Sequence, residues 1–279
     1  MTEQALYPFF AGLFGLLFGS FLNVCIYRWT RDLSVVKPRS ACPGCNHMIA
    51  AYDNIPVLSF LLLKGRCRHC KTKIPWTYPA VELLTAICFA WFVAVEGWNL
   101  AALKDCLFAA IMIGLIFADL DRRLLPDEFT VGGFFAGLAF SFFVPLPPTV
   151  FALLLTIVHL NPGLRVTSFG EALVGGVIPA GAMWFLGWIF EKLRDKEYLG
   201  FGDVKMIAMM GAFLGISGVV ITLLFGSLLG SVIGYAWLKI TKKDPATYYL
   251  PFASFLGAGA LIVVAAHGGI TTWYDQLLR

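Results

Sequence analysis

Residues 6–27 read LYPFFAGLFGLLFGSFLNVCIY, a predominantly apolar run that ends directly before Arg28, the first basic residue of the chain. One helix needs roughly 20 such residues to span a bilayer. Residues 1–4 carry no positive charge and no small-x-small cleavage site follows the run, so the pattern is not that of a removed signal peptide. We therefore expect a retained transmembrane helix whose N-terminus lies outside the cytoplasm.

The composition of the whole chain extends this interpretation beyond one helix. Of its 279 residues, 59% are hydrophobic and 14% are charged, whereas globular proteins average about 45–50% apolar and about 25% charged residues. So few charges cannot cover a water-soluble fold with this apolar content, but several membrane passes absorb it. The formal net charge of +4 is too small to indicate a nucleic-acid partner. The composition predicts an all-α polytopic membrane protein.

Apolar stretches of helical length recur along the chain and set the expected topology. We expect about eight transmembrane helices, at residues 6–27, 79–97, 101–119, 129–146, 169–190, 203–214, 219–238 and 251–267. With the N-terminus outside, every Lys and Arg except Lys104, Arg165 and Arg279 falls on the cytoplasmic side, as the positive-inside rule requires. Both termini are then outside the cytoplasm. Residues 151–160 are apolar but too short to span, and we expect an outward loop or an interfacial helix there.

The one long polar stretch, residues 28–78, carries two cysteine pairs. Cys42 and Cys45 are separated by 21 residues from Cys67 and Cys70. Two C-x-x-C pairs at this separation are typical of a tetrahedral four-thiolate zinc site, which leaves no open position and is therefore structural. Disulfides are disfavoured because the expected topology places the stretch in the reducing cytoplasm. His69, inside the second pair, is an alternative ligand.

These patterns divide the chain into three parts. We expect a first transmembrane helix at 1–27, a cytoplasmic zinc-binding loop at 28–78, and the remaining membrane helices at 79–279. The loop has nine basic residues against two acidic ones. We expect this charge to orient the chain and to attract the loop to anionic membrane lipids, rather than to form a dedicated substrate-binding patch.

Carboxylates within or at the edge of a membrane are candidate functional groups because burying them is unfavourable. The candidates by position are Glu82, Asp105, Asp119, Asp121, Asp127, Glu171 and Asp203. Ordinary roles explain several of them: solvation at an outward helix end for Asp105 and Glu171, helix capping for Asp127, and surface pairing for Asp121. Asp119 and Asp203 differ, because the expected topology places both at the cytoplasmic boundary on two helices.

Two aspartates at one depth suggest an acid–base dyad. Neighbouring carboxyls cannot both ionise, so one keeps a proton as general acid while the other deprotonates a water that attacks an amide carbonyl. We expect the shared proton on Asp119, because a helix C-terminus disfavours an anion and a helix N-terminus, as at Asp203, favours one. The alternative is that the Gly-x-Gly-Asp sequence at residues 200–203 is only a helix N-cap after a loop.

Five motifs follow one another along the chain: Gly19-Ser-Phe-Leu-Asn-Val-Cys-Ile-Tyr-Arg28, the two cysteine pairs, Tyr78-Pro-Ala-Val-Glu-Leu-Leu-Thr85, Asp119-Leu-Asp-Arg-Arg-Leu-Leu-Pro-Asp127 and Gly200-Phe-Gly-Asp-Val-Lys205. Together they resemble the bacterial type IV prepilin peptidases; Gly-x-Gly-Asp alone is shared with presenilin-like intramembrane aspartic proteases. The resemblance implies catalytic roles for Asp119 and Asp203, and zinc ligation by Cys42, Cys45, Cys67 and Cys70.

The resemblance also implies an activity, a second cofactor and a location. Members cleave the short leader from prepilins and pseudopilins at the cytoplasmic face of the bacterial inner membrane, and N-methylate the new terminus with S-adenosylmethionine. No Gly-rich nucleotide turn is present, so Glu82, Asn23 and Tyr27 are the polar candidates for that site. Each also has a purely structural alternative. Glu82 could lie in the first turn of its helix, where the helix dipole favours it. Asn23 could form a hydrogen bond between helices, and Tyr27 could belong to the aromatic belt at the membrane interface.

Two departures from the family pattern accompany the resemblance. Residues 147–168 lengthen the stretch between the two aspartates, and a Pro-Phe-Gly-Pro-like element before the last helix reads Pro251-Phe252-Ala253-Ser254. Two other functions remain alternatives: an intramembrane aspartic protease for another substrate, and a non-enzymatic transporter or assembly scaffold. A transporter would usually show internal repeats, and the sequence has no convincing one.

Overall fold

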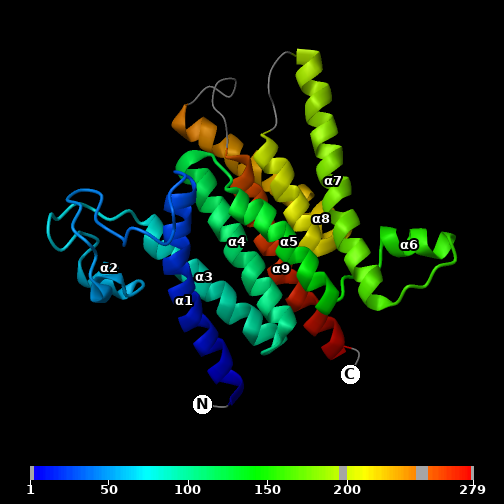
Figure 1. Cartoon of the computed structure of the whole chain (residues 1–279), viewed down its shortest axis with the longest axis horizontal. Helices are drawn as coiled ribbons and strands as arrows, with labels where there is room; N and C mark the ends of the chain where they lie inside the picture. Colours follow the sequence, from blue (N-terminus) through cyan, green and yellow to red (C-terminus); the bar gives the residue numbers. More distant parts are fainter. Residues whose placement is uncertain (1–2, 195–199, 243–250, 278–279) are drawn as a thin grey trace. The chain divides into compact units, whose positions relative to one another are not determined.

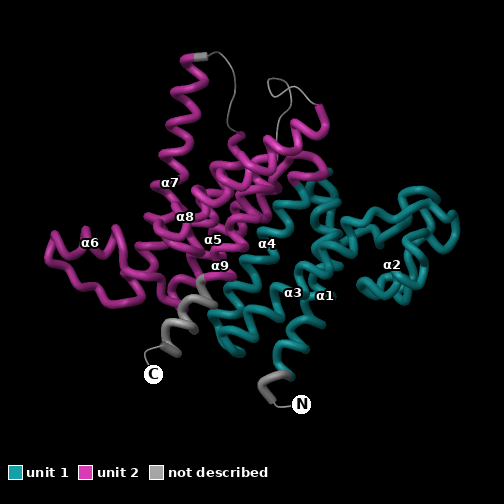
Figure 2. The backbone as a smooth tube through the Cα atoms, turned by 180° about the vertical axis from the view of Figure 1, so that it is seen from behind, with its two compact units in different colours: residues 1–118, 267–279 teal, residues 119–266 magenta. Residues whose placement is uncertain are grey.

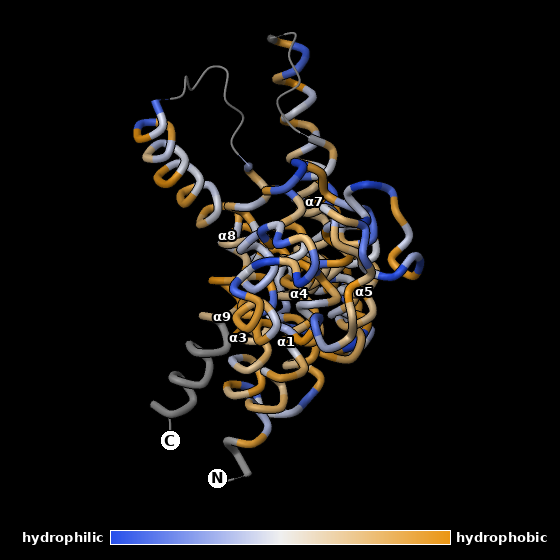
Figure 3. The backbone as a smooth tube through the Cα atoms, turned by 90° about the vertical axis from the view of Figure 1, so that its left-hand side faces the viewer, coloured by the Kyte–Doolittle hydropathy of each residue, from blue (hydrophilic) through white to orange (hydrophobic). Residues whose placement is uncertain are grey.

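The computed structural model describes residues 3–194, 200–242 and 251–277, and most of them are helical (Figure 1). Within these ranges the only extended pairings are two isolated bridges, Ala41 with Met48 and Arg66 with Lys73. Five of the described helices are long and apolar enough to cross a membrane, and residues 252–266 form a shorter apolar helix. Figure 3 shows the hydrophobic residues following these helices. The all-α membrane class is confirmed.

The chain forms two compact units, residues 1–118 with 267–279 and residues 119–266 (Figure 2). The first unit holds α1 (Glu3–Trp29), η1 (Ala51–Asn54), α2 (Leu58–Leu62), α3 (Thr77–Glu96) and most of α4 (Leu100–Arg122). The second unit holds the end of α4 together with α5 (Asp127–Phe143), α6 (Val150–Ile157), α7 (Leu164–Arg194), α8 (Phe201–Thr241) and the first part of α9 (Phe252–Leu277).

In the first unit, α1 and α3 pack together because glycines let their backbones approach closely. A Cβ atom at Gly15 would lie 2.7 Å from Cα of Ala86, and one at Gly19 would lie 2.7 Å from Cα of Glu82. Glycines four residues apart share one helix face, the arrangement typical of close packing between membrane helices. This contact places the C-terminal half of α1 beside the start of α3.

In the second unit, α7 packs against α8, and α5 packs against both. The α7–α8 contact is also a glycine contact, because a Cβ atom at Gly211 would lie 2.0 Å from the carbonyl oxygen of Gly175. Buried apolar side chains from α5, α7, α8 and the α5–α6 connection fill this core: Leu138, Leu146, Ala172 and Ala212, with Phe134 against them.

Helix α8 covers two of the expected spans, residues 203–214 and 219–238, and it is bent between them. Only Gly215 departs from helical geometry, with φ 69° and ψ 179°, a conformation that favours glycine. In Figures 1 and 3 both ends of α8 lie toward the upper side. The chain therefore turns back at this glycine, so the two expected spans are separate passes.

Residues 151–160, for which either a loop or an interfacial helix was expected, contain most of α6, and no residue of this helix is buried. Three basic residues used in the topology argument, Lys196, Lys243 and Arg279, lie outside the described residues.

Candidate active site and metal site

The four cysteines lie on two hairpins of the same design. The N–H of Cys42 donates to the carbonyl of His47 at 2.9 Å, and the N–H of Cys67 donates to the carbonyl of Thr72 at 2.9 Å. The other turn bonds repeat as well, and Asn46 and Lys71 occupy equivalent left-handed positions with φ 54° and 59°. Each C-x-x-C pair is thus presented by a tight turn.

The two hairpins bring the four sulfur atoms into one cluster. The Sγ atoms of Cys42, Cys45, Cys67 and Cys70 all lie within 4.8 Å of one another, and those of Cys42 and Cys70 are 3.6 Å apart. A tetrahedral zinc site with Zn–S bonds of about 2.3 Å requires sulfur separations of about 3.8 Å, so the donor set fits. The cluster contains neither His47 nor His69, whose ring centroids are 3.7 Å apart; the histidine alternative is not supported.

Thr72 forms a hydrogen bond with the sulfur of Cys70 and lowers the pKa of that thiol. Its hydroxyl lies 3.1 Å from Sγ of Cys70. Hydrogen bonds from the hydroxyl and then the N–H of Thr72 lower the pKa of the Cys70 thiol to about 6. Because thiolate is the form that ligates a metal, this contact favours the metal-binding form at neutral pH.

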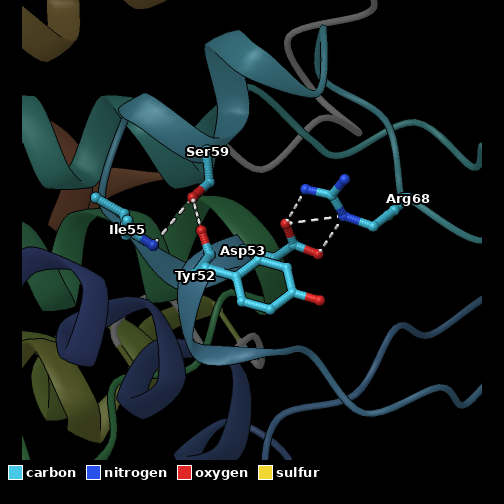
Figure 4. Close-up of polar contacts among 5 residues, drawn as sticks. All are labelled: Tyr52, Asp53, Ile55, Ser59 and Arg68. Carbon is cyan, nitrogen blue, oxygen red and sulfur yellow. Dashed lines mark hydrogen bonds and ion pairs between the residues drawn. The ribbon is translucent and has the colours of Figure 1, made fainter.

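Polar contacts connect the second hairpin to the rest of the segment (Figure 4). Arg68 donates to both carboxylate oxygens of Asp53, from Nε to Oδ2 at 2.9 Å and from Nη2 to Oδ1 at 2.6 Å. These bonds hold the pKa of Asp53 below its usual range. The hydroxyl of Ser59 accepts from the N–H of Ile55 and donates to the carbonyl of Tyr52, each at 3.0 Å. The segment is therefore a connected unit of η1, α2 and the hairpin.

A cavity of about 480 Å³ lies in the first unit, lined by the end of α1, the start of α3 and the cysteine hairpins. Asn23, Tyr27 and Glu82, the three polar candidates from the sequence, all line it. The structure thus brings together residues separated by almost 60 positions. Among the other lining residues are Cys42 and Cys67, so the metal hairpins form part of the wall.

Two of these candidates also make local contacts. The amide of Asn23 donates to the carbonyl of Tyr78 at 3.0 Å, which is the helix-bridging contact considered as its structural alternative. Glu82 accepts a hydrogen bond from the N–H of Val57 at 2.8 Å. Since α3 begins at Thr77, Glu82 lies in its second turn; the alternative that placed it in the first turn is wrong.

Asp119 lies in the last turn of α4, and its side chain is buried, with 6% of the residue exposed. Its Oδ2 atom accepts two hydrogen bonds from Ser254, one from the backbone N–H at 2.9 Å and one from the hydroxyl at 2.7 Å. Ser254 is in the first turn of α9, where backbone N–H groups have no partner inside the helix. The sequence had marked Ser254 only as a departure from the family pattern and gave it no role.

Asp203 lies in the first turn of α8 and is half-buried, within electrostatic range of Asp119. The N-cap of α8 is Gly200, and the backbone N–H of Asp203 donates to the Gly200 carbonyl at 3.0 Å. The capping alternative for Asp203 is therefore not supported. Asp119 and Asp203 are 84 positions apart in the chain, and the structure places them close enough for their charges to interact.

The remaining carboxylates take other roles. Asp121 is exposed, as expected. Asp127 forms an ion pair with Lys205 of α8, whereas Pro126 is the N-cap of α5; the expectation that Asp127 caps the helix is wrong. This pair joins the starts of α5 and α8, close in sequence to Asp203.

Glu171 corrects another expectation. We expected water to solvate it, but it is fully buried. Its carboxylate accepts hydrogen bonds from the N–H of Ala152 at 2.9 Å and from both the N–H and the hydroxyl of Thr149. Because α6 packs on α7, the first-turn N–H groups of α6 replace water as donors.

The chain is similar to known proteins along most of its length. The "Bacterial Peptidase A24 N-terminal domain" profile matches residues 13–95, and the "Type IV leader peptidase family" profile matches residues 106–235. A prepilin leader peptidase/N-methyltransferase of Aeromonas salmonicida is 35% identical over 94% of this chain and 91% of its own length. Proteins of the same name from Myxococcus xanthus and Neisseria gonorrhoeae are 38% and 35% identical, over 87% and 80% of this chain and 69% and 79% of their own. No solved structure matches.

Proposed function

Because this chain belongs to the type IV leader peptidase family, it cleaves prepilin leaders and N-methylates the product, and we propose that Asp119 and Asp203 perform the cleavage. One observation carries the residue assignment: the buried carboxylate of Asp119 at the end of α4 lies within electrostatic range of Asp203 at the start of α8. If substrate binding brings the two carboxyls within hydrogen-bond reach of one water molecule, one can act as the acid while the other acts as the base.

The contacts of Asp119 favour a division of roles within the pair. Two hydrogen bonds from Ser254 and the positive end of the α9 dipole stabilise Asp119 as the anion. This is the reverse of the assignment expected from helix ends alone. In the proposed reaction, Asp119 takes a proton from water as the water oxygen attacks the scissile carbonyl carbon. Asp203 gives its proton to the carbonyl oxygen, which forms a gem-diol. The C–N bond then breaks as the amine leaves with the proton from Asp119, while one gem-diol hydroxyl returns its proton to Asp203 and becomes the carbonyl of the new carboxylic acid.

The methyl donor is proposed to be S-adenosylmethionine, bound in the 480 Å³ cavity of the first unit. The residues that line the cavity include a buried carboxylate, Glu82, and two tyrosines, Tyr27 and Tyr78. A carboxylate and aromatic faces are the groups that stabilise a bound organic cation. When bound there, S-adenosylmethionine supplies the methyl group to the new terminal amine.

The metal is proposed to be one structural zinc ion held by Cys42, Cys45, Cys67 and Cys70. Four sulfur ligands complete the tetrahedral shell, so the site has no position for substrate. Its role is to join the two hairpins, which line the cavity. The cytoplasmic zinc loop of residues 28–78 and the peptidase helices of 79–279 remain our proposed division of the chain.

The location is proposed to be the bacterial inner membrane, with the zinc segment and both aspartates at the cytoplasmic face and both termini outside. Of the 21 basic residues, all but three fall on the cytoplasmic side in this topology, which supports it. The structure also contains helices that are long enough to span a membrane. The proposed substrates are prepilins or pseudopilins, whose cleavage site must reach the two aspartates at this face.

The function is tested by incubating the purified full chain with a prepilin, with and without S-adenosylmethionine, and measuring product masses. We expect leader loss in both reactions, and one added methyl group only with the donor. Glu82→Gln should keep cleavage and lose methylation, whereas Glu128→Gln, an exposed carboxylate of α5, should change neither. No cleavage by the unmodified chain contradicts the function; full methylation by Glu82→Gln contradicts the placement of the donor.

Ser254→Ala should lower kcat for cleavage by about tenfold or more, because a hydrogen bond to a charged group contributes about 1.5–3 kcal/mol. KM should not change, since Ser254 contacts Asp119 and acts through it. Ser254→Thr keeps the hydroxyl and should restore kcat, and Ser227→Ala, at an exposed serine of α8, should have no effect. An unchanged kcat for Ser254→Ala, or no recovery with threonine, would exclude the positioning role.

A further inference from the structure

Helix α2 carries an apolar surface that the fold leaves uncovered. Leu58, Leu61 and Leu62 are 50%, 62% and 72% exposed, and Trp76 is 75% exposed. The three leucines are spaced i, i+3 and i+4 and therefore share one face of the helix. We call these four side chains the α2 patch. Such exposure is ordinary on a membrane-spanning helix, but α2 lies within the polar segment.

The patch adjoins the start of a helix that is able to span a membrane. Trp76 directly precedes α3, which is one of the helices able to span, and aromatic residues at the end of a span occupy the membrane–water interface. Phe60 of α2 packs against Trp76 with ring centroids 4.8 Å apart. Figures 1 and 2 show α2 alongside α1 rather than beyond its C-terminal end. The contact with Trp76 thus holds α2 at the same level as the start of α3.

Basic side chains flank the patch. Lys64 and Arg66 directly follow α2, Lys71 and Lys73 belong to the second hairpin, and all four are exposed. Leucines and a tryptophan on one side with lysines and arginines beside them are typical of helices that lie in the headgroup region of anionic membranes.

We propose that the α2 patch is an interfacial membrane anchor that inserts among the headgroups and upper acyl chains of an anionic bilayer. Two features favour lipid over a protein partner. The patch adjoins α3, a helix able to span the membrane, and the flanking basic residues complement the negative charge of anionic lipids. The anchor fixes the second cysteine hairpin to the membrane surface through Arg68 and Asp53, which link that hairpin to η1.

Hydroxyl-radical footprinting of the full chain, read by mass spectrometry, tests the anchor. The chain is placed at one copy per nanodisc of phosphatidylcholine and phosphatidylglycerol, and each labelling rate is divided by that of the free amino acid. Leu61, Leu62 and Trp76 should be protected about tenfold more than Tyr52 and Met48, which are similarly exposed, 64% and 63%, in the same segment. Equal protection overturns the proposal. Protection that appears only with two copies per disc assigns the patch to a second chain and also overturns it.

A double variant tests the apolar insertion of the α2 patch, and a change of lipid tests the attraction of its basic neighbours to anionic headgroups. Leu61→Glu combined with Leu62→Glu should make Trp76 reactive while the metal content stays unchanged. Val36→Glu, at a residue that is 78% exposed and outside α2, should leave Trp76 protected. Replacing phosphatidylglycerol with phosphatidylcholine should lower the protection severalfold. Unchanged protection of Trp76 in the double variant, or in neutral lipid, contradicts the anchor as stated. Neither result depends on cleavage or methylation, so failure here is distinct from failure of the proposed function.

Discussion

Asp119→Asn and Asp203→Asn should each reduce leader cleavage by at least about a thousandfold, within the range that acid–base groups contribute to enzymatic rates. Asparagine keeps the size and polarity of the side chain but neither takes nor gives the proton. If the two aspartates act as one unit, the double variant is hardly slower than either single one, because losses within a catalytic unit are not additive.

The neighbouring aspartates are matched controls for this result. Asp121→Asn and Asp127→Asn should cost little, because Asp121 is exposed and the Asp127–Lys205 pair is a surface pair, worth about 0–1 kcal/mol. The measurement is the initial cleavage rate of all four single variants at matched expression. Methylation of an already cleaved pilin should survive in each. Strong cleavage by either Asp119→Asn or Asp203→Asn would remove the dyad, and an inactive Asp121→Asn beside an active Asp119→Asn would move the catalytic position by two residues.

Replacing Cys42 and Cys45 together by serine should remove the zinc and unfold the polar segment. Structural zinc contributes about 10–16 kcal/mol to the folding of small zinc domains, and residues 28–78 bury few side chains of their own. Elemental analysis should give one zinc per chain before the change and almost none after it. Trypsin should then cut at Lys64 and Arg66 at rates typical of an unfolded chain.

Methylation should be lost with the zinc, because the hairpins line the proposed donor cavity. Cys88→Ser is the matched control, since Cys88 lies in α3 outside the sulfur cluster, and it should keep both metal and methylation. The zinc proposal fails if the unmodified chain holds substantially less than one zinc, or if the double serine variant keeps its metal and its resistance to trypsin.

The helices followed from the sequence because membrane insertion is decided locally. An apolar run of about 20 residues must satisfy its backbone hydrogen bonds within itself, and in a single segment only a helix does so. The C-x-x-C turns were equally local, since each pair is set by one hairpin of ten residues. Asp119 and Asp203 were found because a carboxylate at the edge of an apolar run stands out without any knowledge of its neighbours.

The partners of those residues could not be derived in the same way. Ser254 reaches Asp119 across 135 positions, and its two hydrogen bonds are the reason that our proposed mechanism reverses the proton assignment expected from helix ends. No local pattern indicates that α9 directs its first turn at the end of α4. Glu171 is a similar case, because its donors come from α6, which had been expected only as a loop or interfacial helix.

The sequence by itself determined the membrane class, the positions of most helices, the two cysteine turns and the identity of the candidate aspartates. All of these depend on the chemistry of neighbouring residues. The tertiary structure alone decided which donors hold Asp119, that Asp127 pairs with Lys205, that Glu171 is buried, and that Asn23, Tyr27 and Glu82 line one cavity. These contacts arise when helices distant in sequence pack together, and local apolar patterns do not specify which side chains then meet.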